Sequence, residues 1–151
     1  MTNSERKQIF ISYSHKDNKK LEELKIMLKG KFREEEIRIW DDSKIQPGEK
    51  WGEKIDEALS FARVAVLLVT KNFLASDFIM EKELPYILTE VNEGFVKIAW
   101  IYWGYCNYEG TELEKFQALN DLTRPLDRLN KPEREAKLSE IVHRIYMMGQ
   151  E

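Results

Sequence analysis

The chain has 151 residues, of which 42% are hydrophobic and 34% charged, so its size and composition are those of one folded domain and exclude a disordered segment. Its 24 basic and 27 acidic residues are intermixed and sum to a net charge of -3, which argues against direct binding of nucleic acid. Because the chain has one cysteine, Cys106, only two histidines and no apolar window of bilayer length, we expect a single cytoplasmic domain over residues 1–151, without a disulfide, metal site or membrane span.

The first part of the chain predicts strands that alternate with helices. Gln8 to Tyr13 is a short apolar run that ends in polar residues, as a buried strand does, and a helix is expected from Asn18 to Lys31 with Gly30 near its end. Residues 36–40 predict a second strand, which leads into a long loop rich in Asp, Ser, Pro and Gly. Apolar residues at helical spacing then predict a helix from Trp51 to Phe61.

The second part begins with the clearest strand of the sequence. Arg63 to Thr70 is almost uninterruptedly apolar, which is typical of a central strand covered on both faces. A helix is expected from Ser76 to Asn92, where Pro85 predicts either a kink or a helix that restarts with the proline in its first turn. Further elements are expected as a strand over Phe95–Trp103 with Trp100 and Trp103 in the core, a short helix over Glu112–Asn120, a small edge strand within Leu122–Leu129, and a final helix over Pro132–Met148.

This alternation predicts an α/β fold with a doubly wound parallel sheet of about five strands, flavodoxin-like in order, and helices on both faces. Ligands of such sheets bind beyond the carboxyl ends of the strands. The loops after Tyr13, Trp40, Thr70 and Trp103 are therefore the places where a site is expected.

Several common sites are disfavoured. The sequence contains no GxGxxG, GxxxxGK[ST] or GxSxG pattern, which argues against a dinucleotide fingerprint, a P-loop and a serine hydrolase. Cys106 is interpreted as a packing residue, since nothing in the spacing brings His15 or His143 to it. A phosphoacceptor receiver needs an aspartate at the end of the central strand, where this chain has Thr70.

Four segments resemble bacterial members of the TIR (Toll/interleukin-1 receptor) domain family. They are IFISYSHKD at residues 9–17, IRIWDDSKIQPGEKW at 37–51, SDFIMEKEL at 76–84 and ELEKFQALNDLTRPL at 112–126. They occur in the family's order, and the resemblance covers roughly residues 7–148. It implies a five-stranded parallel sheet and identifies Asp41 to Lys50 as the family's BB loop.

Many TIR domains consume NAD+, and the resemblance implies this activity here. The family's catalytic glutamate lies in a stretch that matches SxFxxxxEL, which places it at Glu83, or at Glu81 if the register slips by two residues. The implied reaction is cleavage of the nicotinamide–ribose bond to give ADP-ribose or a cyclic isomer, with NAD+ as substrate and no cofactor. One carboxylate is chemically sufficient, because nicotinamide on a cationic ring is a good leaving group and the carboxylate stabilises the oxocarbenium-like ribose.

The resemblance also implies which residues bind the substrate. It places Ser12, Tyr13, Ser14 and His15 of the first loop and Asp41 of the BB loop in the pocket, with Ser76 on the opposite wall. The rings of NAD+ need flat partners, for which Tyr13, Trp40 and Trp51 are the aromatic candidates.

In this family a neighbouring subunit completes the active site, so activation by self-assembly is expected. Ile45, Pro47 and Gly48 at the tip of the BB loop suit such a contact. The implied partners are other TIR domains and a fused or co-encoded sensor, and the implied role is an effector of bacterial antiphage defence. The alternative is a non-catalytic scaffold that binds other TIR domains in signalling, and the carboxylate at position 83 favours the enzyme.

Overall fold

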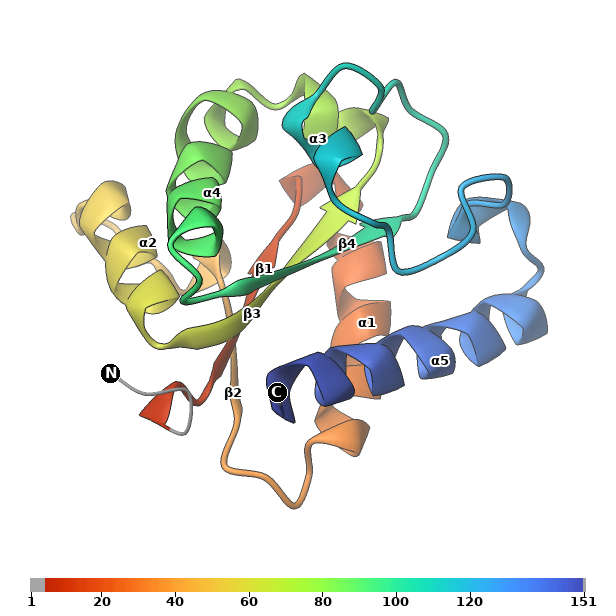
Figure 1. Ribbon diagram of the computed structural model, residues 1–151, viewed down its shortest axis with the longest axis horizontal. Coiled ribbons are helices and arrows are strands. Elements are labelled where there is room, and N and C mark those ends of the chain that lie inside the picture. The colour runs from red at the N-terminus through yellow and green to blue at the C-terminus, as the bar shows by residue number, and fades with distance from the viewer. Residues whose placement is uncertain (1–4, 151) are drawn as a thin grey trace.

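A computed structural model of the chain describes residues 5–150, and its centre is one parallel β-sheet (Figure 1). The strands are β1 (Gln8–Ser12), β2 (Arg38–Asp41), β3 (Ala62–Val69) and β4 (Lys97–Tyr102), in the order β2-β1-β3-β4. After β1 the chain adds β2 on one side of the sheet, and after β3 it adds β4 on the opposite side. The strand order therefore reverses between the two central strands, β1 and β3. In such sheets a crevice opens at the carboxyl ends of those two strands.

Helices cover both faces of the sheet, which confirms the doubly wound arrangement (Figure 1). Successive residues of a strand point to opposite faces, so the apolar strands β1 and β3 supply two separate cores. On one face Ile9, Ile11, Val64 and Val66 pack with α1 (Asn18–Lys31) and α5 (Lys131–Gln150). On the other face Phe10, Ala65 and Leu67 pack with α2 (Trp51–Ser60), α3 (Lys71–Ala75) and α4 (Leu84–Asn92).

The sheet has four strands within the described residues, so the expected edge strand in Leu122–Leu129 is wrong. The side chain of Asn120 replaces it: its Oδ1 accepts from the Tyr102 N–H and its Nδ2 donates to the Tyr102 carbonyl, each at 2.9 Å. The side-chain amide of Asn120 thus makes the two hydrogen bonds to Tyr102 that one backbone peptide group of a neighbouring strand would make. Pro125 has no N–H for a ladder, and the chain then forms a 3-10 turn at Leu126–Arg128.

The helix expected from Ser76 to Asn92 contains a wider turn just before the proline. Ile79–Glu83 forms a wider, π-helical turn in which the Leu84 N–H bonds to the Ile79 carbonyl. Residues 77–92 are helical without a break, and α4 has Pro85 in its first turn directly after the wider turn, which accommodates the missing N–H within the helix. Pro85 therefore lies in the first turn of α4 as predicted, although the helical run does not stop before it.

Among the remaining expectations, one helix is shorter in the structure than predicted, and the expected core tryptophans are confirmed. The short helix expected over Glu112–Asn120 is one 3-10 turn at Glu112–Lys115. Gly30 lies within α1, which continues to Lys31. Trp100 and Trp103 are 1% exposed and belong to the core as expected.

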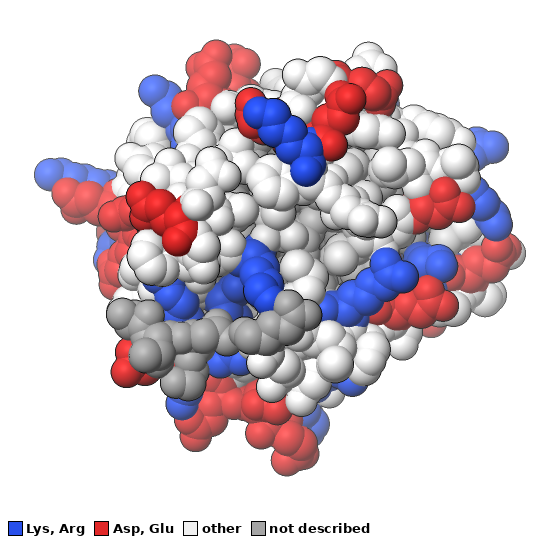
Figure 2. All heavy atoms as spheres, in the orientation of Figure 1, with Lys and Arg blue, Asp and Glu red and all other residues white. Residues whose placement is uncertain are grey.

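The surface is charged in both signs. Figure 2 shows acidic side chains mainly around the rim of the view, and basic side chains both at the rim and in an interrupted row across the lower half. Among residues 5–150, no helix combines the length and the apolar composition that crossing a membrane requires.

Candidate functional site

A cavity of about 490 Å³ opens where the strand order reverses. Its walls come from the loop after β1, the BB loop after β2, the start of α2, and the segment that runs from α3 into the π-helical turn. Five residues expected in the pocket line it: Tyr13, Ser14, His15, Trp51 and Ser76.

Local hydrogen bonds and ring contacts fix these walls. The hydroxyl of Ser14 accepts from the Lys16 N–H at 3.3 Å, and the hydroxyl of Ser76 accepts from the Ile79 N–H at 3.2 Å. Both serines therefore stabilise turns as well as facing the cavity. The ring of Trp51 stands edge-on to that of Phe78, with centroids 5.1 Å apart, and this pair forms the aromatic wall.

Glu83 lies at the end of the π-helical turn and is 2% exposed. Its carboxyl group accepts a hydrogen bond from the hydroxyl of Ser12, the last residue of β1, which is itself buried. Burial raises the pKa of Glu83 to about 8, the hydrogen bond from Ser12 opposes that rise, and the charges of Asp42 and Asp41 add to it. Burial therefore favours the protonated form of Glu83.

Glu83 and Ser12 adjoin the cavity without lining it. Ser12 precedes Tyr13, and Glu83 follows Ile79 by one helical turn, while Tyr13 and Ile79 are both cavity residues. The neighbouring acid of the motif, Glu81, is exposed. The two acids of SDFIMEKEL thus differ in environment, and only Glu83 is turned into the protein beside the cavity.

Trp40 and Asp41, like Ser12, do not line the cavity, so three of the expected pocket positions are corrected. Trp40 is half-buried and stacks on Phe10 with ring centroids 4.9 Å apart, so it packs with the core under α2 and α4. Asp41 is fully buried and forms an ion pair with Lys25 of α1 at 2.8 Å. The reason is the strand period of two, which sends Trp40 and Asp41 to opposite faces of the sheet.

Asp41 instead holds the start of the BB loop. Its Oδ1 accepts from the Ser43 N–H at 3.0 Å and from the Ser43 hydroxyl. Burial by itself would raise the pKa of Asp41, but the hydrogen bonds from Lys25 and Ser43 and the Lys25 charge lower it overall. The residue is thus a buried, ionised anchor between α1 and the loop.

Asp42 takes the cavity position that the sequence suggested for Asp41. Its Oδ1 lies 2.9 Å from Nε2 of His15, whose side chain is 71% exposed. Burial raises the pKa of Asp42 although the hydrogen bond to His15 lowers it. This contact joins the loop after β1 to the BB loop beside the cavity.

The three residues proposed for the assembly contact differ in exposure. Ile45 is half-buried and lines the cavity, so its side chain turns inward instead of presenting itself at the loop tip. Pro47 and Gly48 are exposed. Gly48 has a φ of 87°, a conformation that glycine adopts at little cost, and it makes the turn at the tip.

Two other candidate chemistries find no support in the site. Burial, with a further contribution from the charge of Glu109, raises the pKa of Cys106 to about 11, so the thiolate of a nucleophile is disfavoured. Thr70, which follows β3, uses its hydroxyl as the N-cap of α3 and as a donor to Asp17. Both outcomes agree with the interpretation of the sequence.

Sequence reasoning missed half of the cavity wall. The residues not singled out are Lys16, Asp42, Asn72, Ala75, Phe78 and Ile79. Asn72 follows Thr70, in one of the loops where a ligand was expected, so its position in the fold was a usable signal. The apolar members carry no such signal, because their pattern is that of core residues.

Comparisons with known proteins agree with the fold. The family model described as "TIR domain" matches residues 9–141. The uncharacterized protein y4lF of Sinorhizobium fredii is 26% identical over 118 residues, which is 78% of this chain and 36% of that protein, so the chain spans about a third of the curated relative's length.

Two solved structures share the fold at low sequence identity. The TIR domain of the Toll-related receptor TRR-2 from Hydra magnipapillata superposes with a TM-score of 0.65 at 14% identity, covering 95% of this chain and 98% of that one. The TIR domains of the activated Roq1 resistosome, which directly recognises the pathogen effector XopQ, give a TM-score of 0.52 at 20% identity, covering 90% and 83%.

Proposed function

The chain belongs to the TIR domain family, and on this premise we propose that it is an NAD+ glycohydrolase in which Glu83 acts on the ribose next to nicotinamide. The observation that carries the proposal is the buried Glu83 carboxyl group, bonded to Ser12 beside a cavity at the carboxyl ends of β1 and β3. The products are nicotinamide and either ADP-ribose or a cyclic isomer.

The reaction needs little from the protein beyond placement of one negative charge. When the bond between C1′ of the ribose and the pyridinium nitrogen breaks, its electron pair neutralises the ring, and nicotinamide leaves without a general acid. The ribose becomes an oxocarbenium-like cation, which an adjacent carboxylate stabilises. Water then adds to C1′ and loses a proton, or an atom of the adenine ring adds and closes the cycle.

The pKa of Glu83 fits a site that is switched by a cationic substrate. A pKa of about 8 favours the protonated carboxyl group as long as no cation lies beside it. A positive pyridinium ring in the adjoining cavity favours the ionised form, since an opposite charge within a few ångströms lowers the pKa of a carboxyl group. Binding of NAD+ thus generates the carboxylate that the reaction uses, and the hydrogen bond from Ser12 supports that form.

The cavity suits the nicotinamide end of such a substrate. Its volume of about 490 Å³ lies within the usual range of small-molecule sites. Trp51, Phe78 and Tyr13 supply aromatic surfaces for a flat ring, while Ser14, Asp42 and Asn72 supply polar groups for hydroxyls and the carboxamide.

Self-assembly is the proposed switch. Glu83 is 2% exposed, so a neighbouring segment has to move before a ribose can reach it. The BB loop borders the cavity through Asp42 and Ile45 and exposes Pro47 and Gly48 to a second TIR domain. In this scheme the isolated domain has low turnover, and contact through the loop opens the site. The role that follows is a cytoplasmic effector of bacterial antiphage defence, joined to a sensor in the same or a co-encoded protein.

The same burial favours a second candidate, a non-catalytic scaffold that binds other TIR domains. A carboxyl group that stays protonated and covered in the assembled state would be a core residue and not a catalytic one.

The two candidates are separated by release of nicotinamide from NAD+ at high protein concentration, with and without a crowding agent. The proteins compared are the wild type, Glu83→Gln, and Glu81→Gln, which removes the same charge from an exposed position. We expect release by the wild type and by Glu81→Gln, and loss of release in Glu83→Gln. If no variant releases nicotinamide although all assemble, the scaffold replaces the enzyme; loss in Glu81→Gln alone would move the catalytic role to Glu81.

A further inference from the structure

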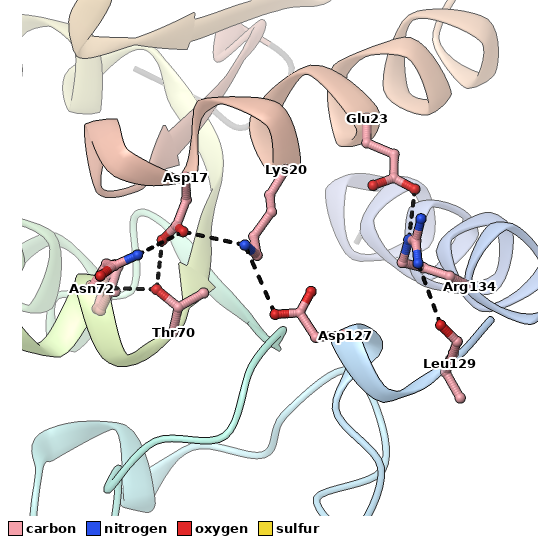
Figure 3. Close-up of polar contacts among 9 residues, drawn as sticks. Asp17, Lys20, Glu23, Thr70, Asn72, Asp127, Leu129 and Arg134 are labelled. Atoms are coloured by element: carbon pink, nitrogen blue, oxygen red, sulfur yellow. Dashed lines mark hydrogen bonds and ion pairs between the residues drawn. The ribbon is translucent and has the colours of Figure 1, made fainter. Parts of the chain in front are cut away.

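A buried polar cluster lies behind one wall of the cavity, and Asp17 is its centre (Figure 3). Asp17 is 2% exposed, and its carboxylate accepts from the Thr70 hydroxyl at 2.6 Å and from Nδ2 of Asn72 at 3.0 Å. Nζ of Lys20 lies 3.4 Å from Asp17 and 3.8 Å from Asp127. Charge and hydrogen bonds therefore hold this carboxylate in one position.

Asn72 is the member of this cluster that reaches the cavity. Figure 3 shows its amide nitrogen turned toward Asp17 and its amide oxygen turned away. A carboxylate can only accept hydrogen bonds, so this orientation follows from chemistry and does not depend on telling nitrogen from oxygen. Within residues 5–150, no hydrogen bond occupies Oδ1 of Asn72. The cavity wall at this point thus presents a fixed acceptor.

We propose that Oδ1 of Asn72 is a specificity-determining acceptor for a hydrogen-bond donor of the substrate, and that Asp17 is a positioning residue that acts through it. The inference rests on the proposed function. It adds that this wall selects a hydrogen-bond donor of the ligand and not an acceptor. At the nicotinamide end of NAD+, where the proposed reaction takes place, the ribose hydroxyls and the N–H of the carboxamide supply such a donor.

If the cluster had a purely structural role, the orientation of the Asn72 amide would not affect the ligand. Thr70 and Lys20 already provide the carboxylate of Asp17 with a hydroxyl donor and a charge, so the bond from Asn72 is not needed to satisfy it. What that bond adds is the orientation of the Asn72 amide. The decisive experiment is therefore one that reverses this orientation while residues 17 and 72 stay hydrogen-bonded to each other.

Asp17→Asn makes this reversal. Nζ of Lys20 donates to the same oxygen of Asp17 as Nδ2 of Asn72 does, so the substitution is made in a Lys20→Met background, where no cation opposes a nitrogen at this position. The new amide at position 17 then keeps an oxygen toward the Thr70 hydroxyl and places its nitrogen opposite Asn72, which turns its own oxygen inward and its nitrogen to the cavity. Lys20→Met alone is the reference for this variant and for the double substitution. The wall changes from an acceptor to a donor, and we expect kcat/KM for NAD+ to fall about tenfold or more. Combining Asp17→Asn with Asn72→Asp restores an acceptor in the cavity at unchanged net charge, and we expect it to recover most of the loss.

A second substrate separates the two possible donors. Nicotinic acid adenine dinucleotide has a carboxylate in place of the carboxamide but the same ribose hydroxyls. If the carboxamide N–H is recognised, the wild type discriminates against this analogue and Asp17→Asn loses or reverses the discrimination. If a ribose hydroxyl is recognised, Asp17→Asn lowers kcat/KM for both dinucleotides by the same factor. A loss caused by damage to the fold is not recovered by the double substitution.

Asn72→Ala provides a second route, because it removes the acceptor and leaves Thr70 and Lys20 on Asp17. Thermal unfolding of each variant shows that it is folded, and binding of NAD+ is measured by calorimetry alongside turnover. Unchanged kcat/KM and affinity in both Asp17→Asn and Asn72→Ala, with an active wild type, overturn this inference and leave the proposed function intact. The wild type could also bind NAD+ without turning it over. If Asp17→Asn then weakens this binding and the double substitution restores it, the inference is supported and the enzymatic function is excluded. No binding by the wild type overturns both.

Discussion

Replacing Glu83 by glutamine is expected to stabilise the fold at neutral and alkaline pH. Glu83 is 2% exposed, and its pKa rises from 4.5 to about 8, mainly through burial. Between these two values the folded protein holds a proton that the unfolded chain releases. The wild type therefore loses stability as the pH rises through this window, whereas glutamine, which does not ionise, keeps its stability.

The size of the effect follows from the shift in pKa. Each pH unit in the window removes about 1.4 kcal/mol from the free energy of unfolding. At pH 7 the wild type should thus be about 3 kcal/mol less stable relative to Glu83→Gln than at pH 4.5, and the difference should stop growing above pH 8. For a domain of this size about 3 kcal/mol is a large part of the total stability.

The assay is urea unfolding of the wild type and Glu83→Gln at several pH values from 4 to 9, followed by tryptophan fluorescence. The matched control is Glu81→Gln, because Glu81 is exposed in the same segment. Its stability relative to the wild type should vary little with pH. The hydrogen bond from the Ser12 hydroxyl persists in Glu83→Gln through the amide oxygen, so a large loss of stability at pH 4.5 is not expected.

Two results would refute this reasoning. A difference between Glu83→Gln and the wild type that stays constant from pH 4 to 9 would mean that Glu83 ionises with an ordinary pKa and is accessible to water. An equal pH dependence in Glu81→Gln would mean that overall charge, and not burial of one carboxyl group, controls the effect.

Three further predictions concern the fold. Lys25→Met leaves the fully buried Asp41 without its ion pair and should lower the free energy of unfolding by about 2 to 3 kcal/mol at pH 7, as measured in urea; an unchanged midpoint would show that Ser43 alone holds the carboxylate. Asn120→Leu removes both hydrogen bonds to the Tyr102 backbone and should cost about 1 to 3 kcal/mol, with faster hydrogen exchange at the outer edge of β4 as the independent readout. Gly30→Ala adds a Cβ that meets nothing within 4 Å inside α1 and should stabilise by roughly 0.5 kcal/mol; a lower unfolding midpoint would contradict the helical conformation.

The sequence predicted the sheet and its helices because these depend on short-range patterns. Arg63 to Thr70 could only be a strand covered on both faces, and β3 with its two cores is that strand. Pro85 predicted a first helical turn because a missing N–H is a local property. The expected fifth strand failed because β4 pairs at its outer edge with the Leu119 N–H and the Asn120 side chain, and no periodicity reports such single hydrogen bonds.

Some residues of the candidate site could likewise be predicted from the sequence, and others could not. The resemblance placed Ser14 and His15 in the pocket, and both line the cavity; its motif also singled out Glu83. It was not enough to separate Asp41, the last residue of β2, from Asp42, the first residue of the 3-10 turn that follows, since the backbone changes direction between them. The catalytic role of Glu83 and the substrate contacts remain predictions for the nicotinamide assay.

The sequence by itself determined which segments form strands and helices and, through four motifs in order, which family the chain belongs to. These are properties of neighbouring residues, and they are readable without coordinates. Only the tertiary structure decided the environment of each acid: Glu83 buried against Ser12, Asp41 buried and ionised against Lys25, and Asp17 turning the Asn72 amide. The physical reason is that burial and charge partners come from residues far apart in the chain, and these set the pKa of a carboxyl group.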